Sequence, residues 1–270
     1  MTAIPAPMAP VRRRSVRGAA ISNLSLQVIS VVVVLGIWEI LGRLAPLFTS
    51  YPSAIVGGFY EVAVVRNELL PALATTLIGL VLGYSIAAAL GIAIGFAMGL
   101  SHVVETALDP YVSALYSTPR IVLVPVLILW LGIDLEIRVA MAILTAIFPI
   151  IINTFVGVKS VDRELLDTGR AFTATRWQRV RMITVPASVP FVFTGLRVGI
   201  SRALEGVVIA EMTAAVTGTG ALLLNYGRFF QTDKLMGPVI VLGLMSIALA
   251  GMVRLVERRL TPWSRLRAEL

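Results

Sequence analysis

Long apolar stretches, most of them as long as a membrane span, alternate with short polar segments along this chain. A span needs about 20 mostly apolar residues. The pattern predicts an all-α fold, a polytopic membrane helical bundle of about six transmembrane helices, because a helix satisfies its own backbone hydrogen bonds in lipid. The predicted spans are Leu24–Leu44, Leu70–Leu100, Tyr111–Leu131, Leu135–Gly157, Ala187–Met212 and Leu235–Val256.

Two of these windows differ from a plain span. The third contains Pro119 and Pro125 and has Arg120 near its middle, so we expect a kinked or broken helix there. The second is longer than a span needs, which indicates a tilted helix or one that continues into water. Its small-xxx-small spacing favours close helix packing within the subunit over a dimer seam. The glycines concerned are Gly79, Gly83, Gly91, Gly95 and Gly99.

Composition agrees with a chain that is solvated by a bilayer. Of its 270 residues, 57% are hydrophobic and only 14% are charged, whereas about a quarter of a soluble domain is charged. There is no cysteine, and a single histidine, His102, makes a histidine-based metal site improbable. The net charge of +8 comes from basic residues at the edges of the spans, which argues for membrane orientation and against a nucleic-acid partner.

Basic residues also orient the chain. They gather before the first span, between the fourth and fifth spans, and after the last one. The positive-inside rule therefore puts both termini in the cytoplasm of a multi-pass membrane protein. Within it we expect a disordered cytoplasmic tail at 1–20, a six-helix transmembrane domain at 21–258 with a cytoplasmic loop at 159–186, and a cytoplasmic C-terminal tail at 259–270. A cleaved signal peptide at the N-terminus is the weaker alternative.

The loop at 159–186 is the longest polar interruption of the membrane pattern. It lacks the Gly, Ser and Pro richness of a flexible linker, so ordered structure is expected. Asp162 is placed to cap a helix that runs to Phe172, and Ala174–Ile183 is typical of a second short helix rich in arginine. Two short helices beside a membrane would form a docking element.

The spacing of residues in this loop resembles that of binding-protein-dependent ABC importer permeases. Their motif is EAA, three residues, Gly, nine residues, Ile, one residue and Leu-Pro. The spacing fits throughout, although several identities differ, and Thr173 replaces a hinge glycine that would bend at little cost. We therefore expect a differently shaped bend. The matching positions are Asp167-Thr168-Gly169, Thr173, Ile183 and Val185-Pro186.

Further segments resemble the permeases for nitrate, taurine, alkanesulfonates and thiamine precursors, among them 161–166, 195–197 and 210–212. The resemblance implies a type I ABC importer-like permease fold. It also implies a homodimer of permeases, ABC ATPase subunits that bind ATP and Mg, an extracytoplasmic solute-binding protein, and no cofactor or catalysis on this chain. It assigns ATPase coupling to Asp162, Glu164, Leu165, Asp167, Thr168, Gly169, Phe172, Thr173, Arg176, Trp177 and Pro186.

For Arg176 and Trp177, anionic membrane lipids are the alternative partner. The nearest approach to a phosphate loop on this chain is Gly157-Val158-Lys159-Ser160, which does not match the G-x-x-x-x-G-K-[ST] pattern. A nucleotide site on this chain is therefore not expected.

Ionisable residues within the fifth span should face protein or water. Arg197, Ser201 and Glu205 follow each other at four-residue steps, so we expect them to form a stripe that lines the interior. The arginines would favour an anionic solute, whereas the alternative is that Arg197 pairs with Glu205 or caps free backbone groups. The pathway candidates are Arg120, Asn153, Arg197, Ser201, Arg202, Glu205 and Glu211.

Two of these candidates have a structural alternative. Asn153 is expected to donate a hydrogen bond across helices, and Glu211 either gates the outer end or anchors the loop from Thr213 to Gly220. The resulting hypothesis is a permease subunit for a small anionic solute. A self-sufficient secondary transporter is the alternative, which the lack of a convincing internal repeat disfavours. An intramembrane enzyme is disfavoured too, because H-E-x-x-H and G-x-S-x-G are absent.

Overall fold

A computed structural model describes residues 16–44, 50–214 and 217–261, with side chains from residue 25 onward. The chain divides into two units, Met1–Ala54 and Ile55–Leu270, and each is described by itself. Most of the tails expected at 1–20 and 259–270 lies outside the described residues.

The first unit is dominated by α1 (Val16–Leu44), of which Ser25–Leu44 is apolar enough to cross a membrane. Its last turns are tied to the segment that follows. The carboxylate of Glu39 accepts hydrogen bonds from the backbone N–H of Ser53 (3.0 Å) and from its hydroxyl (2.7 Å). The indole of Trp38 donates to the carbonyl of Ser50 at 2.8 Å. This end of the helix is thus fixed by polar contacts.

Helices make up the second unit, and no strand occurs among its described residues. The prediction of an all-α bundle is therefore confirmed. Across the described residues of both units, five helices, α1 included, are long and apolar enough to span, and a bent pair brings the number to six if it counts as one span. The elements are α2 (Pro52–Tyr60), η1 (Glu61–Val65), α3 (Leu69–Leu100), α4 (His102–Ser117), η2 (Arg120–Leu123), α5 (Val124–Leu131), α6 (Leu135–Lys159), α7 (Arg163–Ala171), α8 (Arg176–Arg179), η3 (Val180–Thr184), α9 (Val185–Ala214), α10 (Thr219–Arg228) and α11 (Thr232–Leu260).

Helices α3 and α6 are held together by a glycine ladder, defined as five glycines of α3 and the residues of α6 that cover them. A Cβ added at any of these glycines would lie 2.5–2.9 Å from an atom of α6, closer than side chains approach in packed interiors. The glycines therefore pack within the chain, as their spacing favoured. The pairs are Gly79–Arg138, Gly83–Ala142, Gly91–Ile150, Gly95–Thr154 and Gly99–Val158.

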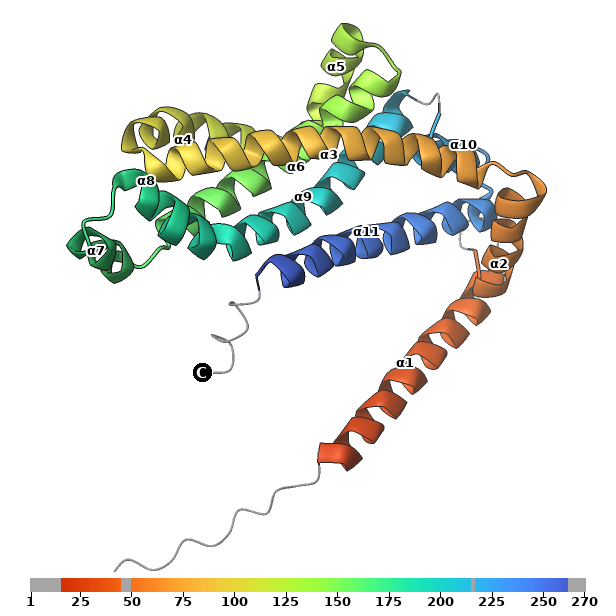
Figure 1. Ribbon diagram of the computed structural model, residues 1–270. Helices are drawn as coiled ribbons and strands as arrows, with labels where there is room; N and C mark the ends of the chain where they lie inside the picture. The colour runs from red at the N-terminus through yellow and green to blue at the C-terminus, as the bar shows by residue number, and fades with distance from the viewer. Residues whose placement is uncertain (1–15, 45–49, 215–216, 262–270) are drawn as a thin grey trace, which may run out of the picture. The chain divides into compact units, whose positions relative to one another are not determined.

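In every pair of the ladder the residue of α6 follows the glycine by the same number of positions, so α3 and α6 run in the same direction. The chain between them must therefore return from one end of the bundle to the other. We call these the α7 end and the α10 end, after the short helices that lie there (Figure 1).

The return is made by a broken helix. His102–Ser117 and Arg120–Leu131 pass as one apolar span only together, and they meet at an angle of 90°. The break falls at Thr118 and Pro119, which are extended, since a residue before proline is driven out of the helical region. The predicted break in the third window is thus confirmed, although its first helix begins earlier than Tyr111.

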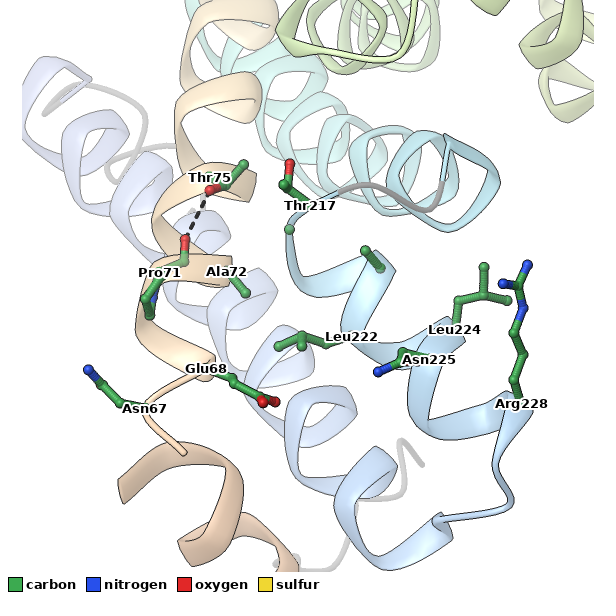
Figure 2. A pocket seen from close by; sticks show the side chains of 12 residues that line it. Asn67, Glu68, Pro71, Ala72, Thr75, Thr217, Leu222, Leu224, Asn225 and Arg228 are labelled. Carbon is green, nitrogen blue, oxygen red and sulfur yellow. Dashed lines mark hydrogen bonds between the residues drawn. The ribbon is translucent and has the colours of Figure 1, made fainter. Parts of the chain in front are cut away.

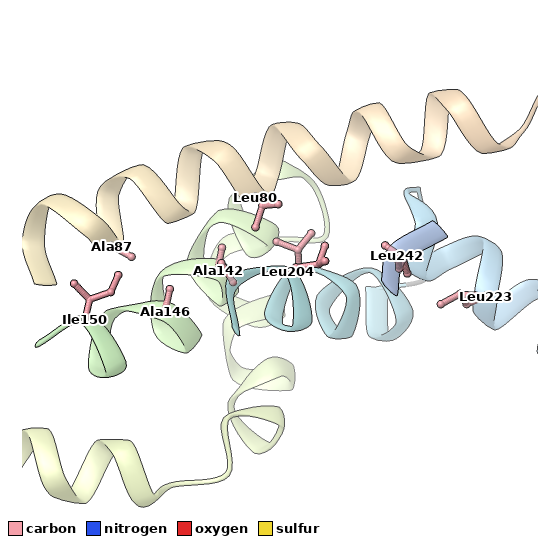
Figure 3. Close-up of a cluster of buried hydrophobic side chains, with 10 residues drawn as sticks. Leu80, Ala87, Ala142, Ala146, Ile150, Leu204, Leu223 and Leu242 are labelled. Atoms are coloured by element: carbon pink, nitrogen blue, oxygen red, sulfur yellow. The ribbon is translucent and has the colours of Figure 1, made fainter. Parts of the chain in front are cut away.

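Helix α9 lies antiparallel to α6 and uses its own small residues for close approach. A Cβ on Gly195 or Gly199 would lie 2.9 Å from Asn153 or Ile150 of α6. Figure 3 shows the resulting core, in which Ala87 of α3, Ala146 of α6 and Leu204 of α9 meet among side chains that are at most 9% exposed. The core thus joins α3, α6 and α9 into one packed group, and α11 packs against α9.

Candidate functional site

Helix α7 forms as its sequence predicts. The Asp162 carboxylate accepts a hydrogen bond from the backbone N–H of Glu164 at 2.9 Å, which satisfies one of the free donors of the first turn. The exposed side chains of Asp167 and Arg170 pair at 2.7 Å, and the Thr168 hydroxyl donates to the Glu164 carbonyl at 2.8 Å. All of these contacts are local, so they shape the helix and do not dock it elsewhere.

Two large apolar side chains of this polar segment remain uncovered. Leu165 is 42% exposed and Phe172 is 81% exposed. An apolar side chain at the surface of a charged helix loses the free energy that burial would provide. Exposure of both on one short element is typical of a surface that another chain covers.

The turn after α7 contains the substituted hinge. Ala174 donates its N–H to the Gly169 carbonyl at 3.0 Å, and Thr173 donates to the Arg170 carbonyl at 2.9 Å, which together make a Schellman motif. Thr173 has a φ of 56°, the left-handed conformation that glycine adopts without strain. The exchange of glycine for threonine therefore does not require a differently shaped bend.

The segment predicted as a second short helix, Ala174–Ile183, is helical from Arg176 onward, but it does not end before the fifth span. Helix α8 begins with a capping box between Thr175 and Gln178 and continues through the π turn η3 into α9 without an interruption. Pro186 follows this π turn, where the i→i−4 ladder is already shifted, so its missing N–H does not end the helix. The turn at Thr173 is thus connected directly to the fifth span.

Gly169 lies where α7 comes close to the segment that follows it. A Cβ there would lie 3.0 Å from Cδ1 of Ile183 and 3.2 Å from Cγ of Arg179. Helix α7 therefore packs closely on the α8–η3 segment. A movement of α7 would be passed to the start of α9 through this contact.

The stripe expected on α9 is divided between two surroundings. Arg197 lies 3.6 Å from Glu257 of α11, and the Ser201 hydroxyl lies 3.3 Å from that of Ser246, also on α11. The alternative pairing of Arg197 with Glu205 is wrong, because Glu257 approaches the arginine from a neighbouring helix. Arg197 and Ser201 thus line the contact between α9 and α11.

Glu205 pairs with Arg202 on its own helix at 2.8 Å, and both side chains are more than half exposed. This ion pair sits near the middle of α9, at a depth where an ionised group facing lipid costs about 2.5–3.5 kcal/mol. The pair therefore needs water or a second protein surface beside it. Glu205 is thus the member of the stripe that remains exposed, with Arg202 paired to it.

Arg120 and Asn153 are held by local contacts. Arg120 donates to the Tyr116 carbonyl at 3.0 Å, and its guanidinium lies 5.2 Å from the ring centroid of Tyr116 and 5.9 Å from that of Phe148. The Asn153 amide donates to the Pro149 carbonyl of its own helix at 2.7 Å. The expected bond of Asn153 across helices is therefore replaced by one within α6.

Glu211 is the most deeply buried candidate. Its carboxylate accepts hydrogen bonds from the Thr76 hydroxyl (2.9 Å) and from the backbone N–H of Gly220 (2.9 Å). The Nε atom of Arg138 lies 3.5 Å from it, and the two side chains are 8% and 0% exposed. Thr219 adds a backbone bond to Thr76 at 3.0 Å. We call these five residues the α10-end polar cluster.

The α10-end polar cluster joins α3, α6, α9 and α10, so the geometry favours the anchoring role of Glu211 over a gating role. Arg138 was missed as a functional candidate. A signal was present, because Arg138 lies just inside the start of its predicted span and Glu211 just inside the end of the next one. Consecutive spans run antiparallel, so the two depths match.

A pocket of about 590 Å³, lined by both polar and apolar residues, adjoins the cluster at the same end. Figure 2 shows Glu68 and Thr75 of the α3 region on one side and Asn225 and Arg228 of α10 on the other. Glu68 also accepts a hydrogen bond from the hydroxyl of Tyr226. None of the predicted pathway residues lines this pocket.

Comparisons with known proteins agree with this architecture. The family model described as binding-protein-dependent transport system inner membrane component matches residues 87–265. The riboflavin transport system permease protein RibX of Chloroflexus aurantiacus is 31% identical over 260 residues, which cover 94% of this chain and 97% of RibX. The taurine transport system permease protein TauC of Escherichia coli (strain K12) is 28% identical over 259 residues, 93% of this chain and 94% of TauC.

Among solved structures, a chain of the MetNI methionine ABC transporter in an inward-facing conformation superposes with a TM-score of 0.61. The match covers 74% of this chain and 98% of that one at 16% identity. At this identity the likeness concerns the fold alone.

Proposed function

We propose that this chain, which belongs to the family of binding-protein-dependent transport system inner membrane components, couples a membrane pathway to a separate ATPase through α7. The single observation that carries the proposal is the exposure of Leu165 (42%) and Phe172 (81%) on a short, capped, polar helix. A groove on a partner would bury both side chains, and the packing of Gly169 on Arg179 and Ile183 would pass the motion of the partner to α9.

The proposed orientation puts the α7 end in the cytoplasm. Basic residues in the described part of this end include Lys159, Arg170, Arg181 and Arg258. An excess of lysine and arginine is typical of the cytoplasmic side. The partner ATPase would hold ATP and Mg on that side. A solute-binding protein would then deliver solute at the α10 end.

We further propose that the exposed Arg202–Glu205 pair faces a second copy of this chain across a water-filled pathway. An Arg/Glu pair is self-complementary under a two-fold axis, since each arginine can approach the glutamate of the other copy. Such a surface would remove the cost of leaving both charges in lipid.

The solute class that we propose is a small anion such as a sulfonate. Arg202 supplies an accessible positive charge near mid-depth, and TauC is named for taurine, which carries a sulfonate. RibX, named for riboflavin, is comparably similar. Replacing Arg202 with glutamine should therefore lower uptake of a sulfonate more than uptake of riboflavin in vesicles that contain the whole transporter.

The coupling role is tested by Phe172→Asp, which puts a charge on the exposed apolar face of α7. We expect the variant to insert normally but to lose co-purification with the ATPase and stimulation of its activity. Phe229→Asp is the matched control, because Phe229 is similarly exposed (69%) but lies at the end of α10. Retained ATPase binding by Phe172→Asp would contradict the proposal. Uptake by the purified chain alone, driven by an ion gradient, would favour a secondary transporter.

A further inference from the structure

An apolar cavity of about 490 Å³ lies at the α7 end, where the last turn of α3, the first turn of α4 and helix α8 meet. Its volume is within the range of about 300–1,000 Å³ that small-molecule sites occupy. Seven residues line it: Ala97, Leu100, Ser101, Val104, Arg176, Trp177 and Val180. Four of the seven are aliphatic and one is aromatic, so the cavity suits a hydrocarbon chain better than a polar solute.

One charged group stands at the edge of this cavity. Arg176 donates a hydrogen bond to the Leu100 carbonyl at 3.5 Å, and Leu100 is the last residue of α3. A guanidinium has five N–H donors in a planar fork that suits phosphate. Since the described contacts of Arg176 use one of them, the others are available to an anionic group at the mouth of the cavity.

The cavity lies at the level where the helices leave the hydrocarbon. The apolar stretch of α3 ends at Leu100, and that of α6 ends beside it at Lys159. Trp177 is 70% exposed there, and tryptophan is enriched at the headgroup level of membranes. An apolar cavity, a tryptophan and an arginine at one depth match the acyl chain, the interface and the headgroup of a phospholipid.

The nearby charges leave the site positive. Glu105, next to Val104 on α4, is already paired with Lys159 at 2.6 Å. Arg181, one turn beyond Trp177, is exposed and adds to the positive charge. A zwitterionic headgroup would gain less from such a site than an anionic one, because basic residues attract anionic lipid.

We propose that this cavity binds an anionic phospholipid, with an acyl chain against Leu100, Val104 and Val180 and its phosphate at Arg176. The assignment to the cytoplasmic leaflet rests on the orientation proposed above. The lipid, and not the ATPase, is then the partner of Arg176 and Trp177. A bound lipid would brace the α8 segment against the end of α3, next to the turn that contains Thr173.

The test is native mass spectrometry of the full chain in detergent, without ATPase, titrated with phosphatidylglycerol or phosphatidylcholine. Wild-type chain should bind phosphatidylglycerol more tightly. Arg176→Gln should weaken this binding about fivefold, because one arginine near an anionic membrane surface contributes about 1 kcal/mol to binding. Arg258→Gln removes an exposed arginine of α11 at the α7 end, and it should leave the affinity for phosphatidylglycerol unchanged. Ala97→Trp, which fills the cavity, should weaken binding of both lipids.

Equal binding of the two lipids, or an equal effect of Arg176→Gln and Arg258→Gln, would overturn the proposal. So would displacement of the bound lipid by soluble glycerol phosphate, which carries no acyl chain. If Arg176→Gln keeps lipid binding but loses the ATPase, the arginine belongs to the ATPase contact and the lipid site is wrong. Because lipid binding is measured without ATPase, its outcome is independent of the Phe172→Asp experiment.

Discussion

Arg138 and Glu211 approach each other from antiparallel helices, with 3.5 Å between Nε and Oε1 and with both side chains buried. Removing one member of such a pair leaves an unpaired buried charge, which costs about 3–5 kcal/mol. We expect Glu211→Ala to lower the free energy of unfolding by this amount. Arg138→Met combined with Glu211→Leu should recover much of the loss, because a packed apolar pair does not bury a charge.

Thermal unfolding in detergent measures this effect. Asp167→Ala is the control, since it breaks an exposed ion pair (64% and 66% exposed), and such pairs contribute little. Similar destabilisation by Asp167→Ala and Glu211→Ala would mean that the α10-end polar cluster does not stabilise the fold.

The glycine ladder predicts a sharp contrast between glycines. A Cβ at Gly83 would lie 2.5 Å from Cβ of Ala142, whereas a Cβ at Gly243 meets no atom within 4 Å. Gly83→Val should therefore force α3 and α6 apart and cost about 1–3 kcal/mol or more, and Gly243→Val should not. The yield of folded protein and its melting temperature decide the matter; equal values for the two variants would exclude close packing along this seam.

Replacing Thr173 with glycine, the residue found at this position of the motif, should stabilise the turn after α7. A β-branched residue at a φ of 56° is strained by about 1–3 kcal/mol, so Thr173→Gly should stabilise the turn by up to about 1 kcal/mol after the entropy of glycine is subtracted. Thr168→Gly, within α7, should instead cost about 1 kcal/mol. Limited proteolysis of the loop would report both changes, and faster cleavage of Thr173→Gly would contradict the strain.

Glu61 predicts a pH dependence at the α10 end. Lys234 donates a hydrogen bond to its carboxylate at 2.7 Å and Arg66 pairs with it at 2.9 Å; these contacts lower the pKa of Glu61 below its ordinary value of 4.5. A lowered folded-state pKa stabilises the fold above the unfolded-state value, and the stabilisation is lost as pH falls through the folded-state value.

Wild-type chain should therefore be more stable than Glu61→Gln at pH 7, and the difference should shrink below about pH 4.5. Melting temperatures at a series of pH values give this comparison. A constant difference down to pH 3 would show that the contacts with Lys234 and Arg66 do not depend on the charge of Glu61.

Local signals in the sequence were sufficient to predict features that depend on a single segment of the chain. The apolar lengths located the spans, Asp162 marked the start of α7, and Pro119 marked the break in the third span. Each of these outcomes depends on groups that lie within a few residues of each other. The continuity of α8 with α9 was not foreseen, because a π turn accommodates Pro186 without a visible break in the pattern.

Contacts between helices were much harder to infer. Periodicity gave Arg197 a face and a depth but not a neighbour, so Glu257, which comes much later in the chain, could not be chosen over Glu205. Arg138 was missed as the partner of Glu211, although their matching depths in consecutive predicted spans were a signal. The glycine spacing of α3 also indicated a close neighbour, but it did not say which helix that neighbour would be.

Because the sequence offset between glycine and partner is the same in every α3–α6 pair, all five contacts depend on one relative register of the two helices. An α-helix turns by about 100° per residue, so one residue deleted within α3 would rotate all the glycines beyond the deletion away from their partners at once. Insertions and deletions are therefore expected outside the two helices, in the connecting segment 101–134, where the break at Pro119 already interrupts the helix. Length variation among related chains should therefore gather there.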